Sequence, residues 1–245
     1  MKRSWLVLFA LVMVVGLVAR RVVDVPRSPG EDSTKAVLDH AQTLEVLEGR
    51  SGEVRILDAS VVHVIDGDTV VVASDGAEQK VRYVGVDTPE RDRPQHDVAT
   101  RFNSALVRGQ RVRLAVDRRR ERDKAGRLLA AVFLVSDGEP SVRLVNDELV
   151  RSGLAYTYFK GRNVVQETLH AGLVASQRTA LDGQQGLWAE PTNRLGVDAQ
   201  NGPVAATKYR FHRSECGHIA ERKTKSMQRS AALRSGRSPC RTCAP

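Results

Sequence analysis

Acidic residues and one arginine are concentrated in a stretch of thirty residues that reads VVHVIDGDTVVVASDGAEQKVRYVGVDTPE. Asp66 and Asp68 flank a glycine in it, and Asp87 and Glu90 lie at its end. Clustered carboxylates supply the hard oxygen ligands that Ca²⁺ and Mg²⁺ prefer. Arg82 lies between the two acidic pairs, and a guanidinium can hold a phosphate through two parallel hydrogen bonds. The stretch therefore predicts a site at which a divalent cation and an arginine bind one phosphate.

Three short β-strands are expected to position these residues, because apolar, β-branched runs alternate with turn signals. The strands are predicted at residues 61–65, 69–73 and 80–86. If the third strand pairs antiparallel with the second, the four carboxylates gather at one end of the sheet. Asp-Gly turns also occur in ordinary hairpins, so the prediction depends on finding both acidic motifs in this order.

The acidic motifs and a later basic turn resemble those of the staphylococcal-type nuclease (thermonuclease) family. The similarity extends over residues 60–190, about half of the chain. The residues that carry it are Asp66-Gly67-Asp68-Thr69, Arg82, Asp87-Thr88-Pro89-Glu90 and Asp123-Lys124-Ala125-Gly126-Arg127. This resemblance implies an OB-type β-barrel. It also implies a hydrolase that cleaves DNA and RNA with little sequence preference and leaves 3′-phosphate ends.

A calcium site is part of what the resemblance implies. Asp68, Asp87 and the main-chain carbonyl of Thr88 look like the family's calcium ligands, and Asp66 lies beside them. Calcium accepts such a mixture of carboxylate and carbonyl oxygens. A divalent cation in this position would polarise the phosphoryl oxygen and lower the pKa of a bound water molecule.

Three residues are expected to take part in catalysis by the same resemblance. Glu90 would act as the general base or would orient the attacking water, and both roles remain open. Arg82 and Arg127 would hold the phosphate and stabilise the charge that develops on it. Arg127 belongs to a run of arginines that alone indicates only a solvated basic face. What distinguishes it is the turn Asp123–Arg127, directly before a strand.

Substrate binding is expected from Lys124, in the same turn, and from two tyrosines. Tyr156 and Tyr158 lie where the family stacks a base and contacts a terminal phosphate, and stacking on an aromatic ring tolerates any base. Tyrosines at alternating positions also pack beside barrels, so a structural role is an equal alternative. Trp188 is expected in the core, where it would close the last helix.

Residues 52–190 are expected to form one α+β domain. Beyond the first three strands, the pattern predicts a helix at 94–109, strands at 111–116 and 128–135, and a helix at 145–152. A last helix is predicted to begin at Asn163, with Gln166 as its capping-box partner. Five strands with one interposed helix, and about three helices in all, fit an OB-type five-stranded β-barrel.

The N-terminal segment 1–21 has the features of a targeting sequence. Two basic residues precede an apolar run of fifteen residues. Such a run is short against the ~20 residues that a spanning helix needs. Cleavage as a signal peptide and retention as a membrane anchor through residues 4–19 both remain open. Either outcome makes the protein secreted or bound to the outer face of the membrane. Residues 22–51 are expected to be a linker that can form a short amphipathic helix within 34–47.

A second, small module is expected at residues 208–245, after a Gly/Asn/Ala/Pro-rich linker at 191–207. Its zinc-type ligands, at suitable pairwise spacing, are His212, Cys216, Cys240 and Cys243. A segment this short has too little core to fold alone, so a structural Zn²⁺ would stabilise it. The layout is similar to the small zinc domain of the Ada DNA-repair protein, with His212 in place of its first cysteine.

Other interpretations of the C-terminal module remain. Because all three cysteines of the chain lie here, one disulfide and one free thiol would also account for them. His218 is an alternative ligand with poorer spacing. Methyl-transfer chemistry at the zinc-bound cysteines would require Cys216 for activity, whereas a nuclease would not. The many Lys and Arg residues of the module are expected to add affinity for nucleic acid.

The net charge of the whole chain limits the classes of partner. With 38 Lys and Arg against 29 Asp and Glu, the formal charge is +9, which favours polyanions such as nucleic acids or an anionic membrane surface. The main alternative to a nuclease is a surface module that binds nucleic acid for uptake without cutting it. The complete set of acidic and basic motif residues favours the enzyme, and the family resemblance implies a monomer.

Overall fold

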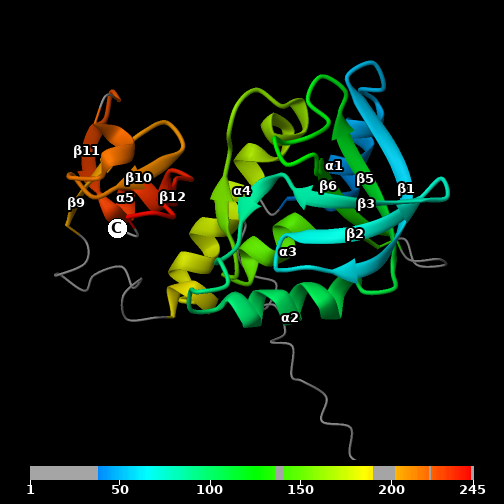
Figure 1. Ribbon diagram of the computed structural model, residues 1–245, viewed down its shortest axis with the longest axis horizontal. Coiled ribbons are helices and arrows are strands. Elements are labelled where there is room, and N and C mark those ends of the chain that lie inside the picture. Colours follow the sequence, from blue (N-terminus) through cyan, green and yellow to red (C-terminus); the bar gives the residue numbers. More distant parts are fainter. Residues whose placement is uncertain (1–37, 136–140, 190–201, 221, 244–245) are drawn as a thin grey trace, which may run out of the picture. The chain divides into compact units, whose positions relative to one another are not determined.

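The computed structural model describes residues 38–135, 141–189, 202–220 and 222–243 (Figure 1). The predicted leader, 1–21, lies outside these ranges, as do parts of both predicted linkers. None of the helices in the described part of the chain combines the length and the hydrophobicity that a membrane crossing requires.

Five strands close into a ring. They are β1 (Val54–Val64), β2 (Thr69–Ser74), β3 (Ala77–Tyr83), β5 (Arg111–Asp117) and β6 (Leu128–Val135). Antiparallel pairing runs in the order β3-β2-β1-β5-β6, and a short β7 (Val142–Leu144) follows β6. The ring closes because β3 also pairs with β6, in parallel. The predicted OB-type five-stranded barrel in an α+β fold is therefore confirmed, as is the antiparallel pairing of the second and third strands.

The predicted third strand is divided in two. After β3, the backbone of Gly85 has a φ of 76°, in the left-handed region that favours glycine. The chain then forms β4 (Gly85–Asp87), which leaves the ring and pairs antiparallel with β8 (Tyr156–Tyr158). This break matters for the site, because it turns Asp87 away from the line of β3 and beside Tyr156.

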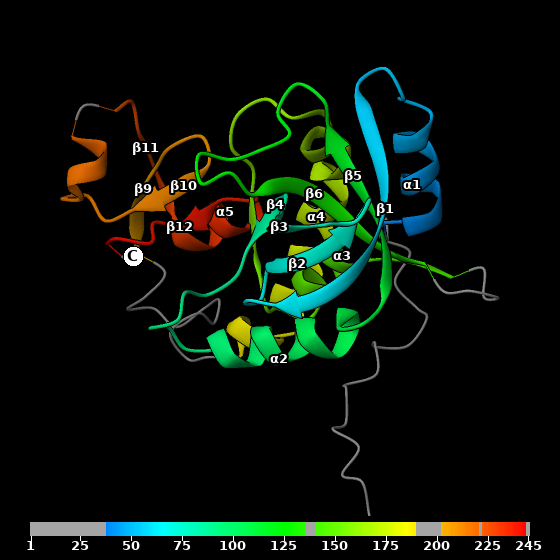
Figure 2. The same cartoon turned by 45° about the vertical axis from the view of Figure 1, so that its right-hand side comes forward.

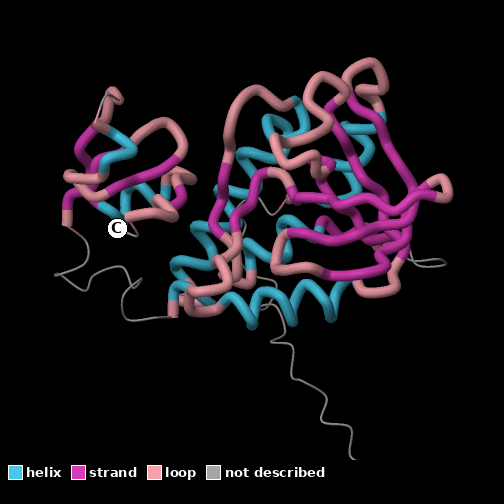
Figure 3. Tube along the Cα trace, in the orientation of Figure 1, coloured by secondary structure: helices cyan, strands magenta, loops and turns pink. Residues whose placement is uncertain are grey.

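The helices cover the ring (Figures 2 and 3). They are α1 (His40–Glu48), α2 (His96–Val107), α3 (Val145–Arg151), α4 (Val164–Asp182) and the 3₁₀ turn η1 (Gly186–Trp188). Contacts from α3 and α4 cover β6, which explains why this strand is an apolar run with nearly every residue buried. In Figure 2, α1 lies beside β1, and α2 runs below the strands.

Two local predictions agree only in part with the structure. The short helix expected within 34–47 is present as α1, but its Leu44 and Leu47 are buried in the barrel core instead of lying in an open linker. Asn163 does cap α4, since its side chain accepts a hydrogen bond from the Gln166 N–H at 3.0 Å. The side chain of Gln166, however, accepts from the N–H of Lys160 at 3.1 Å, so it does not close a capping box.

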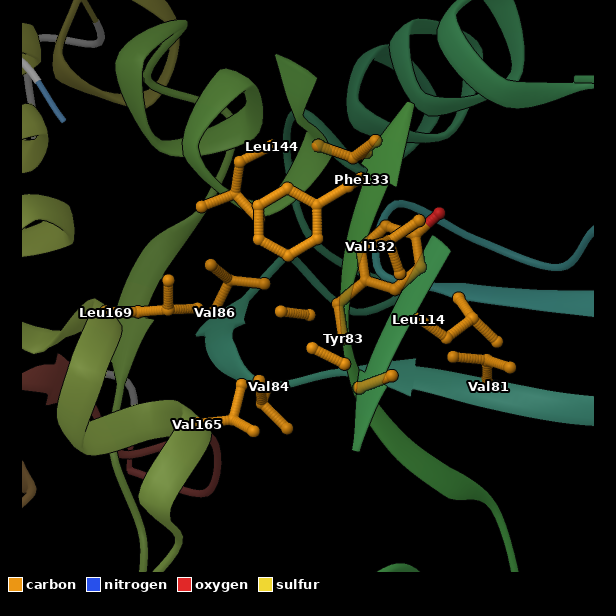
Figure 4. Close-up of a cluster of buried hydrophobic side chains, with 14 of the residues drawn as sticks. Val81, Tyr83, Val84, Val86, Leu114, Val132, Phe133, Leu144, Val165 and Leu169 are labelled. Carbon is orange, nitrogen blue, oxygen red and sulfur yellow. The ribbon is translucent and has the colours of Figure 1, made fainter. Parts of the chain in front are cut away.

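The main core lies between the ring and the helices (Figure 4). Tyr83 and Phe133 are its largest members, and each is at most 1% exposed. They lie among aliphatic side chains from β3, β4, β5, β6, β7 and α4, which include Val81, Val84, Val86, Leu114, Val132, Leu144, Val165 and Leu169. Trp188 is also buried, as predicted, but in a second apolar cluster.

The C-terminal module is a small mixed sheet with one helix. It consists of β9 (Pro203–Ala206), β10 (Arg210–His212), η3 (Gly217–Ile219), β11 (Lys225–Gln228), α5 (Arg229–Arg234) and β12 (Ser238–Pro239). The strand order is β11-β9-β10-β12, so residues 203–206 of the expected linker belong to the sheet.

The module shares a core with the end of α4. Leu181 and Trp188 pack in one apolar cluster with Phe211 and Leu233 of the module. Buried Gln177, in α4, donates a hydrogen bond to the Leu233 carbonyl at 2.5 Å. Its side-chain oxygen accepts from the main-chain N–H of the residue between the two β8 tyrosines at 2.7 Å. One buried amide thus connects both parts of the fold.

Candidate active site and metal centre

Arg82 connects the two acidic motifs. Its Nε lies 3.1 Å from Oδ1 of Asp68, and its Nη2 lies 3.1 Å from Oδ1 of Asp87. All three residues are buried. Burial alone would lower the pKa of Arg82, but the adjacent carboxylates, including Asp66, hold it above its ordinary value. Arg82 is therefore a permanent cation between two carboxylates, where a bound phosphate would find a rigid guanidinium.

A turn and a close backbone approach hold Asp68 in place. The Asp68 N–H donates to Oδ1 of Asp66 at 3.0 Å, an Asx-type turn. Oδ2 of Asp68 accepts from both the N–H and the hydroxyl of Thr88, at 2.8 and 2.9 Å. The predicted ligands Asp66, Asp68, Asp87 and Thr88 are therefore brought together by these bonds and by Arg82, which contacts both Asp68 and Asp87.

Helix α2 supports the acidic loop from below. Asn103, fully buried, donates to the Asp66 carbonyl at 2.9 Å and accepts from the Tyr83 hydroxyl at 3.0 Å. Burial raises the pKa of Tyr83, so its hydroxyl remains protonated. The sequence interpretation missed Asn103. The sequence did carry a signal for it: Asn103 lies four residues after Ala99 and four before Val107, so it falls on the same buried face of the helix.

Glu90 is the most accessible of the predicted catalytic residues. Its side chain is 48% exposed, whereas that of Asp87 is 5% exposed. The loop that carries it is fixed at two points, because the Arg93 N–H donates to the Glu90 carbonyl at 2.9 Å and the His96 ring bonds the Pro89 carbonyl at 2.9 Å. A half-exposed carboxylate beside buried ones has access to solvent water.

Arg127 is placed by a hairpin rather than by the acidic cluster. Asp123 accepts from its Nε at 2.8 Å and its Nη2 at 2.7 Å, and Asp123 also caps the turn through the Ala125 and Arg127 N–H groups. Burial would raise the pKa of Asp123, but the hydrogen bonds from Arg127 bring it below its ordinary value. Since Leu128, the first residue of β6, pairs with Val81, Arg127 lies directly before β6 and next to the strand of Arg82. Lys124 is exposed at the tip of this turn.

The two predicted substrate tyrosines lie on β8 beside the acidic motif. Tyr156 pairs with Asp87 and Tyr158 with Gly85. The Tyr156 ring meets Trp188 edge to face, at 5.2 Å between centroids and an interplanar angle of 88°, which favours the packing role for Tyr156. The Tyr158 ring instead has the guanidinium of Arg210 above it, 4.2 Å from its centroid.

Two arginines of the C-terminal module reach the acidic cluster, which the sequence interpretation did not foresee. Arg210 Nη2 lies 3.1 Å from Oδ2 of Asp87. Arg241 forms ion pairs with both Asp87 and Glu90. Asp87 therefore accepts hydrogen bonds from three guanidiniums, counting Arg82. Local sequence patterns give no signal for these contacts, because the partners are 123 and 154 residues apart.

The four predicted zinc ligands are assembled. Each of His212, Cys216, Cys240 and Cys243 offers one ligand atom, and all four atoms lie within 4.8 Å of one another. The three cysteines are free rather than disulfide-bonded. His218 lies 3.9 Å from the Cys216 sulfur but is outside the set.

The chemistry of this set suits Zn²⁺. Nδ1 of His212 is buried without a hydrogen-bond partner in the described structure, as a nitrogen intended for a metal would be. Burial lowers the pKa of His212, and nearby Arg210 lowers it further, so the imidazole is neutral. Burial alone would raise the pKa of Cys240, but N–H donors from residues 243 and 242 bring it below its ordinary value. Burial raises the pKa of Cys243 to about 11, so this thiol would lose its proton on binding the metal. Neutral imidazole and thiolate are the ligand forms of these residues.

The acidic cluster offers ligands of a different kind. Asp68 and Asp87 are 4% exposed and share Arg82, and carboxylate and carbonyl oxygens are the donors that suit Ca²⁺ or Mg²⁺. The donor set therefore fits a hard divalent cation held by Asp68, Asp87 and the Thr88 carbonyl, with Asp66 supporting the loop. Two compartments with different ligand chemistry lie next to each other, one of oxygen donors and one of sulfur and nitrogen donors.

Comparison with known proteins gives consistent matches. The model of the staphylococcal nuclease homologue family matches residues 80–190. A thermonuclease of Staphylococcus hyicus is 39% identical over 105 residues, which cover 40% of this chain and 58% of that protein. A thermonuclease of Staphylococcus intermedius is 35% identical over 144 residues, which cover 56% of this chain and 80% of that protein.

A third relative, the endonuclease YncB of Bacillus subtilis, is 36% identical over 107 residues, which are 41% of this chain and 48% of that protein. The alignments thus cover less than two thirds of the S. hyicus and B. subtilis proteins, and the family match ends at residue 190, before the C-terminal module. Three observations support one family assignment: the barrel topology, the two acidic motifs joined by Arg82, and an alignment that covers 80% of the S. intermedius thermonuclease. The chain belongs to the staphylococcal nuclease homologue family.

Proposed function

We propose that this chain is a calcium-dependent endonuclease that hydrolyses phosphodiester bonds in DNA and RNA with little sequence preference. The observation that carries the proposal is Arg82, buried between Asp68 and Asp87 at 3.1 Å from each. The two carboxylates already balance the charge of this guanidinium, so it would attract the phosphodiester anion strongly only when a cation also binds those carboxylates. Family membership supports the nuclease class, and the oxygen-donor set supports calcium.

The residues divide the work of hydrolysis among them. Calcium, when bound, would supply polarisation of the phosphoryl oxygen and a more acidic water molecule. Glu90 would accept the proton of the attacking water or orient that water, and its half-exposed carboxylate gives it access to solvent. Arg82 and Arg127 would stabilise the charge that develops on the phosphate oxygens. The P–O5′ bond breaks, which leaves a 3′-phosphate on one product and a 5′-hydroxyl on the other.

The C-terminal ligand set is proposed to hold a structural Zn²⁺. A closed set of three cysteines and one histidine leaves no position for substrate at the metal. The proposal extends to a monomer acting outside the cytoplasm, either secreted or anchored at the outer face of the membrane through residues 4–19. Lys124, exposed at the tip of the hairpin, would contribute phosphate attraction.

The test is cleavage of single-stranded DNA, double-stranded DNA and RNA by the full chain, with calcium, with magnesium and with a chelator. Glu90→Ser should lower kcat by about 100-fold or more, as loss of a general base does. Glu78→Ser, which changes an exposed glutamate of β3, is the matched control and should retain full activity.

The same assay separates the proposal from its alternative. Calcium-dependent cutting that Glu90→Ser abolishes, with 3′-phosphate ends detected by end-labelling, is the expected result. Tight binding of all three nucleic acids without cutting under any metal would instead make the chain a nucleic-acid-binding module. Metal-independent cutting would contradict the calcium assignment.

A further inference from the structure

A pocket of about 310 Å³ lies where the module meets β8. Tyr158 and Lys160 line it from the barrel side, and Tyr209, Arg210, Arg222 and Arg241 line it from the module. The proposed zinc ligands His212 and Cys240 also border it. Among the described residues that line it, none is acidic. The pocket therefore combines two aromatic rings with several cations, the composition of a surface that binds single-stranded nucleic acid.

The pocket is continuous with the acidic cluster through two side chains. Arg210 lies over the Tyr158 ring and also pairs with Asp87. Arg241 pairs with Asp87 and Glu90. Arg241 makes these contacts through all three of its nitrogens, whereas Arg210 uses Nη2 for Asp87 and Nη1 for the Pro239 carbonyl. Since a guanidinium has five N–H donors, both arginines can turn a further N–H towards a phosphate. Whatever occupies the pocket thus lies next to the proposed scissile phosphate.

The zinc-type set fixes the far wall of this pocket. Arg241 belongs to the short loop between the ligands Cys240 and Cys243. The Cys240 N–H donates to the Phe211 carbonyl at 2.9 Å, which ties this loop to β10. Arg210, on the same strand, donates to the Pro239 carbonyl at 2.7 Å. Metal ligation and these bonds together hold both arginines on a rigid support, which lowers the entropic cost of binding.

We propose that this pocket binds one nucleotide of a single-stranded substrate, next to the phosphate that is cut. Its volume is at the lower end of the range for small-ligand sites, about 300–1,000 Å³. One unstacked base fits such a volume, whereas a base in a duplex must first be unpaired. Tyr209 provides the aromatic wall for the base, and Arg210 and Arg241 contact its phosphate. The inference rests on the proposed nuclease function for the position of the cut, but binding itself does not.

The first test measures binding without cleavage. The probes are a fluorescently labelled 12-nucleotide deoxythymidine strand and its uridine counterpart, titrated into the zinc-loaded full chain in buffer without calcium and followed by anisotropy. Tyr209→Leu keeps an apolar side chain against the core that Tyr209 contacts but removes the aromatic face. Stacking of one base is worth ~1–3 kcal/mol, so the Kd of this variant should rise about tenfold.

A second variant and a control make the binding test specific. Arg222→Ala removes an exposed cation of the pocket that has no ion pair with Asp87 in the described structure, and it should lower the salt slope of log K by about 0.7. Lys225→Ala removes an exposed cation from β11 outside the pocket lining and should leave the Kd unchanged. A Kd equal to wild type in both pocket variants would overturn the proposal.

Cleavage provides the second readout. The ratio of kcat/KM for the 12-nucleotide strand to that for a one-nucleotide nitrophenyl ester should fall about tenfold in Tyr209→Leu. A faster oligonucleotide reaction in Arg241→Ala would mean that the arginine only blocks Asp87 and Glu90, which contradicts the proposal. If wild type cuts neither substrate, the nuclease function fails, and the Kd values alone decide whether the pocket binds nucleic acid.

Discussion

Gly67 approaches Thr88 so closely that a side chain on it would have no room. A Cβ added to Gly67 would lie 2.8 Å from both Cγ2 and Oγ1 of Thr88, and 2.9 Å from the Cβ of Ala99 in α2. Real Cβ atoms essentially never approach neighbours this closely. The glycine between Asp66 and Asp68 therefore serves the contact that lets Thr88 donate two hydrogen bonds to Asp68.

Gly67→Ala should consequently reduce both stability and activity. Overpacking in a tight site costs ~1–3 kcal/mol, and displacement of catalytic groups by about 1 Å can lower the rate about 100-fold. Urea unfolding and calcium-dependent cleavage measure the two effects. Gly52→Ala is the matched control, since a Cβ there would meet no atom within 4 Å, and it should behave like wild type. An active, stable Gly67→Ala variant would show that the loop can move away from Thr88.

Asn103→Ala should weaken the support of the acidic loop. The variant leaves the buried Tyr83 hydroxyl and the Asp66 carbonyl without their partner, and each such loss costs ~1–3 kcal/mol. We expect a lower midpoint of urea unfolding and a higher calcium concentration for half-maximal cleavage. Arg101→Ala, on the exposed side of the same helix, should change neither.

Adding Tyr83→Phe to the Asn103 variant tests the mechanism. Because the second change removes the orphaned hydroxyl, the double variant should lose less stability than the sum of the two single variants. Strict additivity would contradict a direct bond between the two side chains.

Asp123→Asn should loosen Arg127 without unfolding the hairpin. The amide oxygen can still accept from the N–H groups that Asp123 caps, but the charge facing Arg127 is lost. Since Arg127 is 34% exposed, we expect a stability loss well under about 1 kcal/mol, with kcat lowered about 10- to 100-fold. Single-turnover cleavage measures the change in kcat. Asp75→Asn, in a turn outside this hairpin, is the control and should behave like wild type.

The same pair predicts a dependence of stability on pH. The folded-state pKa of Asp123 is lowered, so its contribution is fully present above its unfolded value of about 4 and is lost as the pH falls through the folded value. The difference in unfolding free energy between wild type and Asp123→Asn should therefore shrink between pH 5 and pH 2. A difference that stays constant over this range would exclude the ion pair as its source.

Replacing Cys243, one of the four proposed zinc ligands, should weaken metal binding and destabilise the module. Cys243→Ser leaves three ligands of the set, and we expect less than one zinc per chain by elemental analysis and a melting midpoint lower by about 5–10 °C. His218→Ala is the matched control, because His218 lies outside the set, and it should retain the full zinc content. Loss of zinc in His218→Ala would instead mean that His218, and not His212, is the fourth ligand.

Local patterns could predict the barrel and its acidic motifs, because strand periodicity and Asp-Gly turns act over a few residues. They predicted that the third strand could pair antiparallel with the second, and the structure has this pairing, with Arg82 opposite Thr69. Gly85 within the third strand was a signal for the break before β4, since glycine in a strand pattern often marks a bend. Asn103 carried a weaker signal, a polar residue on a buried helix face.

Contacts across long separations could not be predicted in this way. Arg210 and Arg241 belong to a module with many Lys and Arg residues, and as sequence these residues indicate only a general affinity for nucleic acid. What selects them is the docking of the module, which depends on Trp188 and Phe211 sharing one apolar cluster. The buried residues of that cluster come from five elements, α4, η1, β9, β10 and α5, so its existence follows from three-dimensional packing rather than from any local period.

This shared cluster has a consequence for how the molecule opens. Gln177 bonds both the Leu233 carbonyl and the N–H of residue 157, so α5 cannot leave α4 without exposing a buried amide and the indole of Trp188. Amide hydrogens of β10 and of the last turns of α4 should then exchange with solvent at matching rates, as members of one foldon. The amino-acid composition changes near residue 200, but the barrel and the module on either side of this point are expected to unfold together.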